Sequence, residues 1–179
     1  MEGMTKLELL HTSALDAPTL IAARSLLDGA FDGLDEHDWN HALGGMHALV
    51  WEDDGLIGHA SVVQRSLLHG GRALRAGYVE AVAVRGDRRS SGHATTMMNA
   101  LETIIRDAYD LGALSASEAA GDFYAHRNWH RWKGRLHALT PQGTVRTEDD
   151  EGSVHVLPAG APLDLTADLV ADFRDGDLW

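Results

Sequence analysis

The feature that most constrains the fold is a change of hydrophobic period between residues 72 and 116. Residues 72–84 form an apolar run, RALRAGYVEAVAV, that predicts a strand. A turn rich in arginine, glycine and serine follows, and from Ala94 to Leu111 apolar residues recur at helical spacing. Residues 112–116 read as a short buried strand. Strand, helix and strand then form a right-handed βαβ crossover, which predicts a fold of mixed α/β class.

Other segments predict further strands and helices around this crossover. Strands are expected at residues 5–11, 46–52, 56–66, 129–139 and 152–157, and helices at 16–31, 34–45 and 118–127. Asp16 is the expected N-cap of the first helix. Turn signals at residues 54–55 and 69–71 join the strands between residues 46 and 84 into an antiparallel meander. No repeat or linker divides the 179 residues, so we expect a single domain, residues 1–179.

Composition excludes several classes of site and partner. The chain has no cysteine, which removes disulfides, cysteine metal sites and a thiol nucleophile. Its 27 acidic and 15 basic residues give a net charge of -12, which repels nucleic acid and attracts a cationic small molecule. No apolar stretch approaches the ~20 residues of a membrane span, and no secretory signal is visible, so we expect a cytoplasmic protein without membrane contact. The eleven histidines form no metal-binding motif, and no metal is expected.

The turn at residues 85–92 has the composition of an anion site. The first backbone N–H groups of a helix are unpaired and, with the positive end of the helix dipole, attract anions. The turn adds positive charge, hydroxyl donors and a flexible backbone position through Arg85, Arg88, Arg89, Ser90, Ser91 and Gly92. Neither the Walker nor the Rossmann glycine pattern matches this turn. The turn is therefore predicted to bind a pyrophosphate, and the alternative is a solvated basic turn.

Residues 89–94, RSSGHA, resemble the R/Q-x-x-G-x-G/A acetyl-CoA loop of the GNAT acetyltransferases. A more specific resemblance, to the aminoglycoside 2'-N-acetyltransferases of that superfamily, runs from about residue 7 to Trp179. It rests on four segments in the family's order: HALGGMHALVWEDDGLIGHASVVQR, LRAGYVEAVAVR, YDLGALSAS and ADFRDGDLW. The resemblance implies a GNAT acetyltransferase fold, with a mixed, mostly antiparallel sheet flanked by helices and a βαβ acetyl-CoA-binding core. It also implies acetyl-CoA as cosubstrate and a homodimer.

Two segments depart from that family pattern. The segment FDGLDEHDW, residues 31–39, is one residue shorter than the pattern, which bears on antibiotic preference. The segment RRSSGHA is an atypical cofactor loop, which bears on cofactor affinity.

The resemblance also assigns catalytic and cofactor-binding residues. Glu80 would take a proton from the substrate ammonium, and Tyr124 would protonate the departing thiolate. The cofactor would contact the backbone of Val82 and Val84 and the turn residues Arg89, Ser91, Gly92 and Ala94. The Val82 amide and its neighbours are candidate donors to the thioester oxygen. Because no cysteine can carry the acetyl group, direct attack in a ternary complex is favoured. Alternatively, Glu80 is an exposed strand residue and Tyr124 packs in the core.

Substrate binding is assigned by the same resemblance to acidic residues far apart in sequence. The residues are Asp38, Glu80, Ser115, Asp150, Asp177 and Trp179, the last with its terminal carboxylate and as a wall of the site. Carboxylates gathered around a polyamine are compensated by the ligand, whereas without it they repel one another. Outside this family, residues 149–151 would read as a solvated acidic turn.

Three functions are compatible with these residues. The first is acetylation of the 2'-amine of an aminoglycoside antibiotic, in resistance or self-protection. The second keeps the chemistry but takes a smaller 2'-amino sugar antibiotic such as kasugamycin, which the altered loop at 31–38 permits. The third is a non-catalytic acetyl-CoA or antibiotic-binding module, which would need neither Glu80 nor Tyr124, so their presence favours catalysis.

Overall fold

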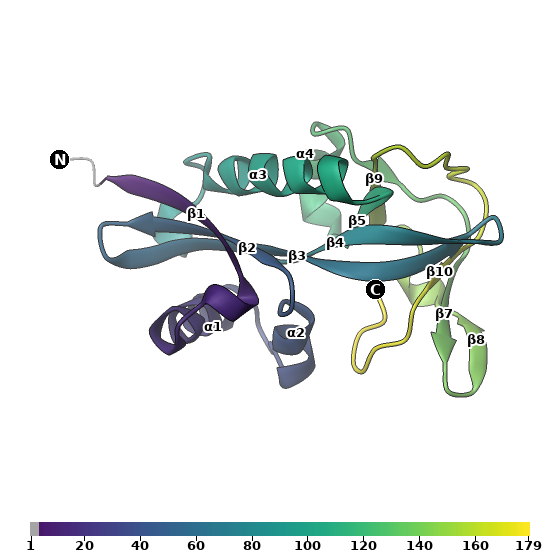
Figure 1. Ribbon diagram of the computed structural model, residues 1–179, viewed down its shortest axis with the longest axis horizontal. Helices are drawn as coiled ribbons and strands as arrows, with labels where there is room; N and C mark the ends of the chain where they lie inside the picture. Colours follow the sequence, from purple (N-terminus) through teal and green to yellow (C-terminus); the bar gives the residue numbers. More distant parts are fainter. Residues whose placement is uncertain (1–3) are drawn as a thin grey trace. The chain divides into compact units, whose positions relative to one another are not determined.

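The structure is a computed structural model that describes residues 4–179 (Figure 1). The chain divides into two compact units. Unit 1 comprises Met1–Val63 and Val79–Thr103, and unit 2 comprises Gln64–Tyr78 and Ile104–Trp179. Three long elements contribute to both units: β3 (Gly55–His69), β4 (Arg72–Val84) and α3 (His93–Ala108).

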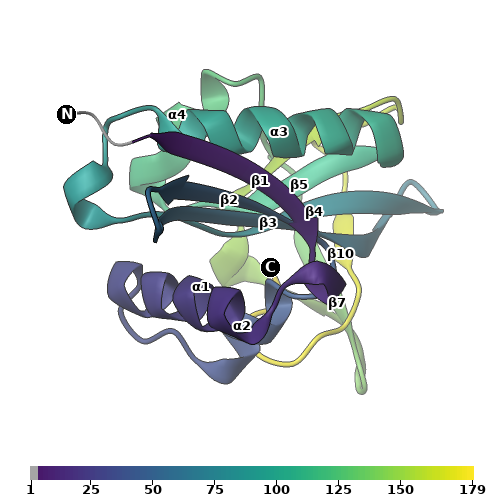
Figure 2. The same ribbon diagram turned by 60° about the vertical axis from the view of Figure 1, so that its left-hand side comes forward.

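Unit 1 is a sheet with helices on both faces. Strand β1 (Thr5–His11) pairs antiparallel with β2 (Met46–Glu52), and β2 pairs antiparallel with β3. Helices α1 (Ala17–Ala30) and α2 (Glu36–His41) lie on one face of this sheet, and α3 lies on the other (Figure 2). The sheet is therefore buried from two sides, which explains why β2 is apolar without alternation.

Helix α1 begins where the sequence predicts it. The side chain of Asp16 accepts a hydrogen bond of 2.9 Å from the backbone N–H of Thr19, which confirms Asp16 as the N-cap. Ala23 is fully buried on the inner face of the helix and packs with Leu49 and Leu56 of the sheet. This apolar contact fixes α1 against β2 and β3.

Helix α3 packs closely on the opposite face because β3 carries a glycine there. A Cβ at Gly58 would lie 3.2 Å from the sulfur of Met97, which is tighter than ordinary van der Waals contact. Met97 and its neighbour Met98 are fully buried. The N-terminal end of α3, with the turn that precedes it, is held in place by this contact.

Unit 2 contains the strand order β6-β9-β5-β4-β3-β10-β7-β8. The bounds of the additional elements are β5 (Leu111–Ser115), α4 (Gly121–Ala125), β6 (His130–Arg131), β7 (Leu136–Thr140), β8 (Gly143–Arg146), β9 (Val154–Pro158) and β10 (Leu169–Ala171). Strand β5 pairs parallel with β4 and is reached through α3, which confirms the βαβ crossover and the α/β class. Single-turn 3-10 helices span Thr12–Ala14 and Gly86–Arg88 in unit 1, and Glu118–Ala120 and Glu148–Asp150 in unit 2.

The prediction of one strand over residues 129–139 is wrong. Its first part, β6, pairs with β9, whereas its last part, β7, pairs with β8 and β10. Between them the backbone N–H groups of Lys133 and Gly134 both donate to the carbonyl of Leu165. A Cβ at Gly134 would lie 1.9 Å from the carbonyl oxygen of Ala167, so only glycine fits where the chain changes partners.

Other boundaries also differ from the prediction. Helix α3 ends at Ala108, so Leu111, expected on its apolar stripe, instead begins β5. The predicted 118–127 helix is a 3-10 turn followed by the short α4. Strands β8 and β10 were not predicted: both are short, and β10 pairs with β3 and β7, which are distant in sequence.

Candidate active site

Beside Glu80, strand β4 contains one residue with the left-handed backbone that is typical of a β-bulge, and we call this position the bulge. Ala81 has φ 53, in the left-handed region, inside a strand that is otherwise extended. This conformation costs a non-glycine residue about 1–2 kcal/mol, so the surrounding structure must support it. Glu80 and Val82, on either side of Ala81, are both partly accessible.

Two buried histidines that the sequence did not single out lie next to the bulge. The ring of His59 is 2.8 Å, through Nδ1, from the carbonyl oxygen of Ala81, and the ring of His47 is hydrogen-bonded to His59. Burial, with smaller contributions from His59 and His11, lowers the pKa of His47 to about 4. Burial likewise lowers the pKa of His59 to about 4. Both imidazoles are therefore neutral at pH 7.

The predicted pyrophosphate turn follows directly after β4. Ser90 has φ 62 and Gly92 has φ 81, and α3 begins at His93. A Cβ built on Gly92 would meet nothing within 4 Å, so open space lies in front of this backbone. Open space, a glycine and a helix start are together what a phosphate group requires, so the turn fits the predicted anion.

Two of the three arginines of this turn are engaged within the protein. Arg88 pairs with Glu52 at 2.6 Å, and Arg85 pairs with Asp87 at 2.6 Å. Hydrogen bonding to Arg88 lowers the pKa of the Glu52 carboxyl, and hydrogen bonding to Arg85 lowers that of Asp87. Arg89 is exposed, and among residues 4–179 its contact is a long one of 3.4 Å from Nε to the carbonyl of Val84, so its guanidinium is available to bind an anion.

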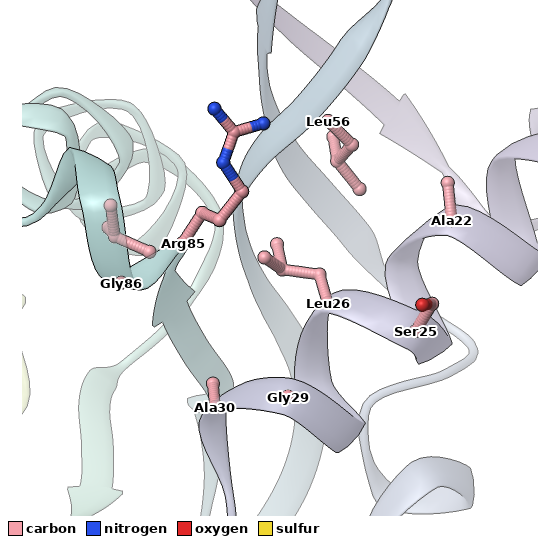
Figure 3. Close-up of a pocket in the computed structure, with 9 residues that line it drawn as sticks. Ala22, Ser25, Leu26, Gly29, Ala30, Leu56, Arg85 and Gly86 are labelled. Atoms are coloured by element: carbon pink, nitrogen blue, oxygen red, sulfur yellow. The ribbon is translucent and has the colours of Figure 1, made fainter.

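A pocket of about 350 Å³ opens beside the start of the turn (Figure 3). Its lining combines α1, β3 and the end of β4: Ala22, Ser25, Leu26, Gly29, Ala30, Leu56, Val84, Arg85 and Gly86. Of the predicted site residues only Val84 contributes, so this pocket is not the predicted acetyl-transfer site. A second pocket, of about 570 Å³, lies in unit 2 between the start of α4 and the loop before β9.

Tyr124 is buried in α4 of unit 2. Its ring packs edge-on against Phe123 and Trp129, with centroid distances of 5.1 and 6.0 Å. The ring of His155, which lines the second pocket, lies 6.3 Å away. Ser115 is exposed at the end of β5, on the strand that leads toward α4. Tyr124 therefore combines core packing with a position next to a pocket.

Three predicted substrate residues come together in unit 2. The buried indole of Trp179 donates a hydrogen bond of 2.8 Å from Nε1 to the hydroxyl of Thr147. The backbone N–H of Asp150 donates to the carbonyl of the same threonine. Burial raises the pKa of Asp150, and the negative charges of Asp177 and Asp149 raise it further. Asp150 and Asp177 are thus near enough to repel each other, which a bound cation would relieve.

A buried arginine that the sequence did not single out holds this C-terminal segment. Arg65 Nε donates to a carboxylate oxygen of Asp172 at 2.8 Å, and its Nη2 donates to the carbonyls of Asp172 and Leu178. Arg174 Nε donates to the carbonyl of Asp177. The segment that carries Asp177 and Trp179 is therefore tied to β3.

Asp38 has a structural partner. Its carboxylate accepts from the backbone N–H of Asp35, and its own N–H donates to the Asp35 carboxylate, forming a capping box at the start of α2. Asp38 lies in unit 1, with Glu80 and the turn, whereas the other predicted substrate carboxylates lie in unit 2.

Residues 4–179 contain no cluster of three or more histidine, aspartate or glutamate side chains arranged to hold a metal ion. No helix in the same range has the length and apolar character needed to cross a membrane.

Comparison with known proteins gives one family model and several relatives. A model described as acetyltransferase (GNAT) domain matches residues 15–132. An aminoglycoside 2'-N-acetyltransferase from Mycolicibacterium fortuitum is 51% identical over 176 residues, covering 96% of this chain and 90% of that protein.

Solved structures that are similar in fold include two acetyltransferases. A GCN5-related N-acetyltransferase from Kribbella flavida matches with a TM-score of 0.59 and 19% identity, over 73% of this chain and 34% of that one. This chain thus spans about a third of that protein's length. A GNAT family acetyltransferase from Brucella melitensis, solved with acetyl-CoA, matches with a TM-score of 0.60 and 12% identity, over 92% of this chain and 94% of that one. At such identities these two structures show the fold alone.

Proposed function

Because the chain belongs to the aminoglycoside 2'-N-acetyltransferase family of GNAT acetyltransferases, we propose that it transfers acetyl from acetyl-CoA to the 2'-amine of an aminoglycoside. The proposal is carried by the order of features over residues 80–92, where Glu80, the left-handed Ala81 and the turn at Gly92 follow one another. One continuous segment would thus carry the proposed base, the proposed backbone donors and the proposed anion site.

Glu80 is the proposed base. An aminoglycoside amine is protonated near neutral pH and must lose its proton before it can attack a carbonyl carbon. A carboxylate at the partly accessible end of β4 can take that proton directly or through a water molecule.

The turn and the bulge are proposed to hold acetyl-CoA, which when bound supplies the acetyl group as an activated thioester. The backbone at Ser91 and Gly92 and the side chain of Arg89 would bind its pyrophosphate, because this is where the helix start is open. The N–H of Val82, next to the bulge, would donate to the oxygen on which negative charge develops.

Tyr124 is the proposed acid for the departing thiolate. A tyrosine phenol carries its proton near neutral pH, which is the form that can donate it. Since the chain contains no cysteine, we propose direct attack of the amine with both substrates bound.

The acidic residues of unit 2 are proposed to bind the cationic antibiotic. Burial raises the pKa of Asp150, and repulsion from Asp177 raises it further; a substrate ammonium near both carboxylates would replace that repulsion with attraction. Ser115, Trp179 and, in unit 1, Asp38 remain proposed contacts of the same ligand.

The experiment that tests this function is release of CoA thiol from acetyl-CoA with a panel of 2'-amino and 2'-hydroxy aminoglycosides and kasugamycin. Release with the 2'-amino aminoglycosides alone supports the proposal. Release with kasugamycin alone would replace it by the smaller-substrate alternative. No release with any antibiotic, while acetyl-CoA still binds, would leave the binding-module alternative.

A further inference from the structure

A hydrogen-bonded series of side chains, two of them buried histidines, ends at the bulge of β4. His47 lies on β2 and His59 on β3, where Leu49 is the residue directly opposite His59. The two histidines are diagonal neighbours on the same face, and His47 Nδ1 lies 2.9 Å from His59 Nε2. Thr12 Oγ1 lies 2.7 Å from His47 Nε2 at one end, and the Ala81 oxygen lies 2.8 Å from His59 Nδ1 at the other. Both rings are fully buried.

The carbonyl oxygen of Ala81, at the end of the series, fixes the direction of each hydrogen bond. A carbonyl oxygen only accepts, so His59 carries its proton on Nδ1 and accepts at Nε2. His47 then donates from Nδ1, and its Nε2 accepts from the hydroxyl of Thr12, whose oxygen lies nearer to this nitrogen, at 2.7 Å, than to the carbonyl oxygen of Gly45, at 3.3 Å. That hydroxyl oxygen accepts in turn from the N–H of Gly44 at 2.8 Å. Every polar atom of the two rings has a defined role in this order, and both rings are neutral, as their burial requires.

This hydrogen-bonded series is not a proton path to Glu80, because it ends at the carbonyl oxygen of Ala81. It acts instead on the backbone conformation of Ala81. A left-handed residue interrupts the ladder of a strand, and its carbonyl then needs another donor. The Nδ1–H of His59 is that donor, on a ring fixed by two strands and by Thr12.

We propose that His59 is a positioning residue of the reaction, which holds Ala81 left-handed and thereby directs Glu80 and the Val82 N–H. The inference rests on the proposed function, because that function gives these two groups their roles. The observation behind it is that both groups adjoin the single residue whose carbonyl His59 binds.

Two substitutions at position 59 separate positioning from packing. His59→Leu fills much of the ring's volume but donates no hydrogen bond to Ala81. His59→Asn places an amide N–H near the position of Nδ1 and can keep that bond. Thiol release with a 2'-amino aminoglycoside should show kcat about 10- to 100-fold lower in His59→Leu, the loss expected from displaced reacting groups. His59→Asn should stay within about 3-fold of the wild type.

The deciding variant adds Ala81→Gly to His59→Leu. Glycine adopts positive φ without the cost of a Cβ, so it should hold the bulge without His59 and restore most of the lost kcat. Removing the methyl group of Ala81 does not improve packing, so better packing could not explain a restored kcat in the double variant. His69→Asn, at a buried histidine of unit 2, is the control for general loss of stability and should leave kcat unchanged. Unchanged kcat in folded His59→Leu, or a double variant as slow as the single, would overturn the inference.

A measurement without substrate separates this inference from the proposed function. The amide resonance of Val82, followed by NMR in the full-length protein, should move in His59→Leu and return in the double variant. A resonance that does not move would overturn the inference even if antibiotics are acetylated. If the wild type itself releases no thiol with any antibiotic, the proposed function fails, and the Val82 resonance alone decides whether His59 holds the bulge.

Discussion

Trp179 is tied by its indole N–H to the hydroxyl of Thr147, at 2.8 Å, on the turn that carries Asp150. We predict that Thr147→Val raises the antibiotic KM about 2- to 10-fold, the value of one neutral hydrogen bond. The acetyl-CoA KM should not change, because the proposed cofactor turn is elsewhere in the sequence. Thr140→Val, which removes a comparable hydroxyl from the β7–β8 hairpin, is the matched control. Equal changes in both KM values would mean that the Trp179 contact is only structural.

Glu80→Gln removes the proposed base while keeping the shape of the side chain. We expect kcat/KM to fall roughly 10- to 1000-fold, most strongly below neutral pH, where more of the amine is protonated and needs a base. Tyr124→Phe should lower kcat with less effect on antibiotic binding. The measurement is a pH profile from 6 to 9 for both variants, and wild-type turnover throughout would refute the two proton-transfer roles.

Gly92→Val should raise the acetyl-CoA KM strongly and leave the antibiotic KM nearly unchanged. The new side chain would occupy the open space before α3, and the backbone at φ 81 would be strained. Gly143→Val introduces similar strain at φ 111 in the β7–β8 hairpin, with no ligand proposed there. Should both variants bind acetyl-CoA like the wild type, the turn would not be the pyrophosphate site.

The buried histidine pair should make the free energy of unfolding depend on pH. The folded pKa values of His47 and His59 are about 4, below the 6.5 of an unperturbed histidine, so the unfolded chain binds more protons between these values. Stability is therefore unaffected by the pair above pH 6.5 and falls as the pH drops toward 4, by up to about 1.4 kcal/mol per pH unit for each ring. Urea unfolding at several pH values should show a shallower decline in His59→Asn. The same slope in both proteins would contradict the pKa assignment.

Elements with local signals were predictable from the sequence. Strands β1, β2 and β4 have the predicted bounds, and Asp16 caps α1 as expected, because strand patterns and caps depend on neighbouring residues. The break between β6 and β7 was not predictable, since it depends on contact with residues 165–167.

The candidate site likewise contains features that local sequence predicts and features that depend on distant residues. Gly92 signals a left-handed turn by its residue type, whereas Ala81 does not, and its conformation depends on a histidine 22 residues earlier. The pairing of His47 with His59 follows from the register of β2 and β3, and the role of Arg65 from a segment more than 100 residues away. Neither can be read from local spacing.

The central claim is that the 2'-amine of an aminoglycoside receives the acetyl group, and a matched pair of antibiotics tests it directly. Kanamycin B carries an amine at the 2' position and kanamycin A a hydroxyl, with the remaining amines shared. The measurement is the position of the acetyl group on the product by NMR, together with thiol release for both compounds. We predict a single acetyl group on the 2'-nitrogen of kanamycin B and no release with kanamycin A. Acetylation of both compounds at a shared amine would contradict the account.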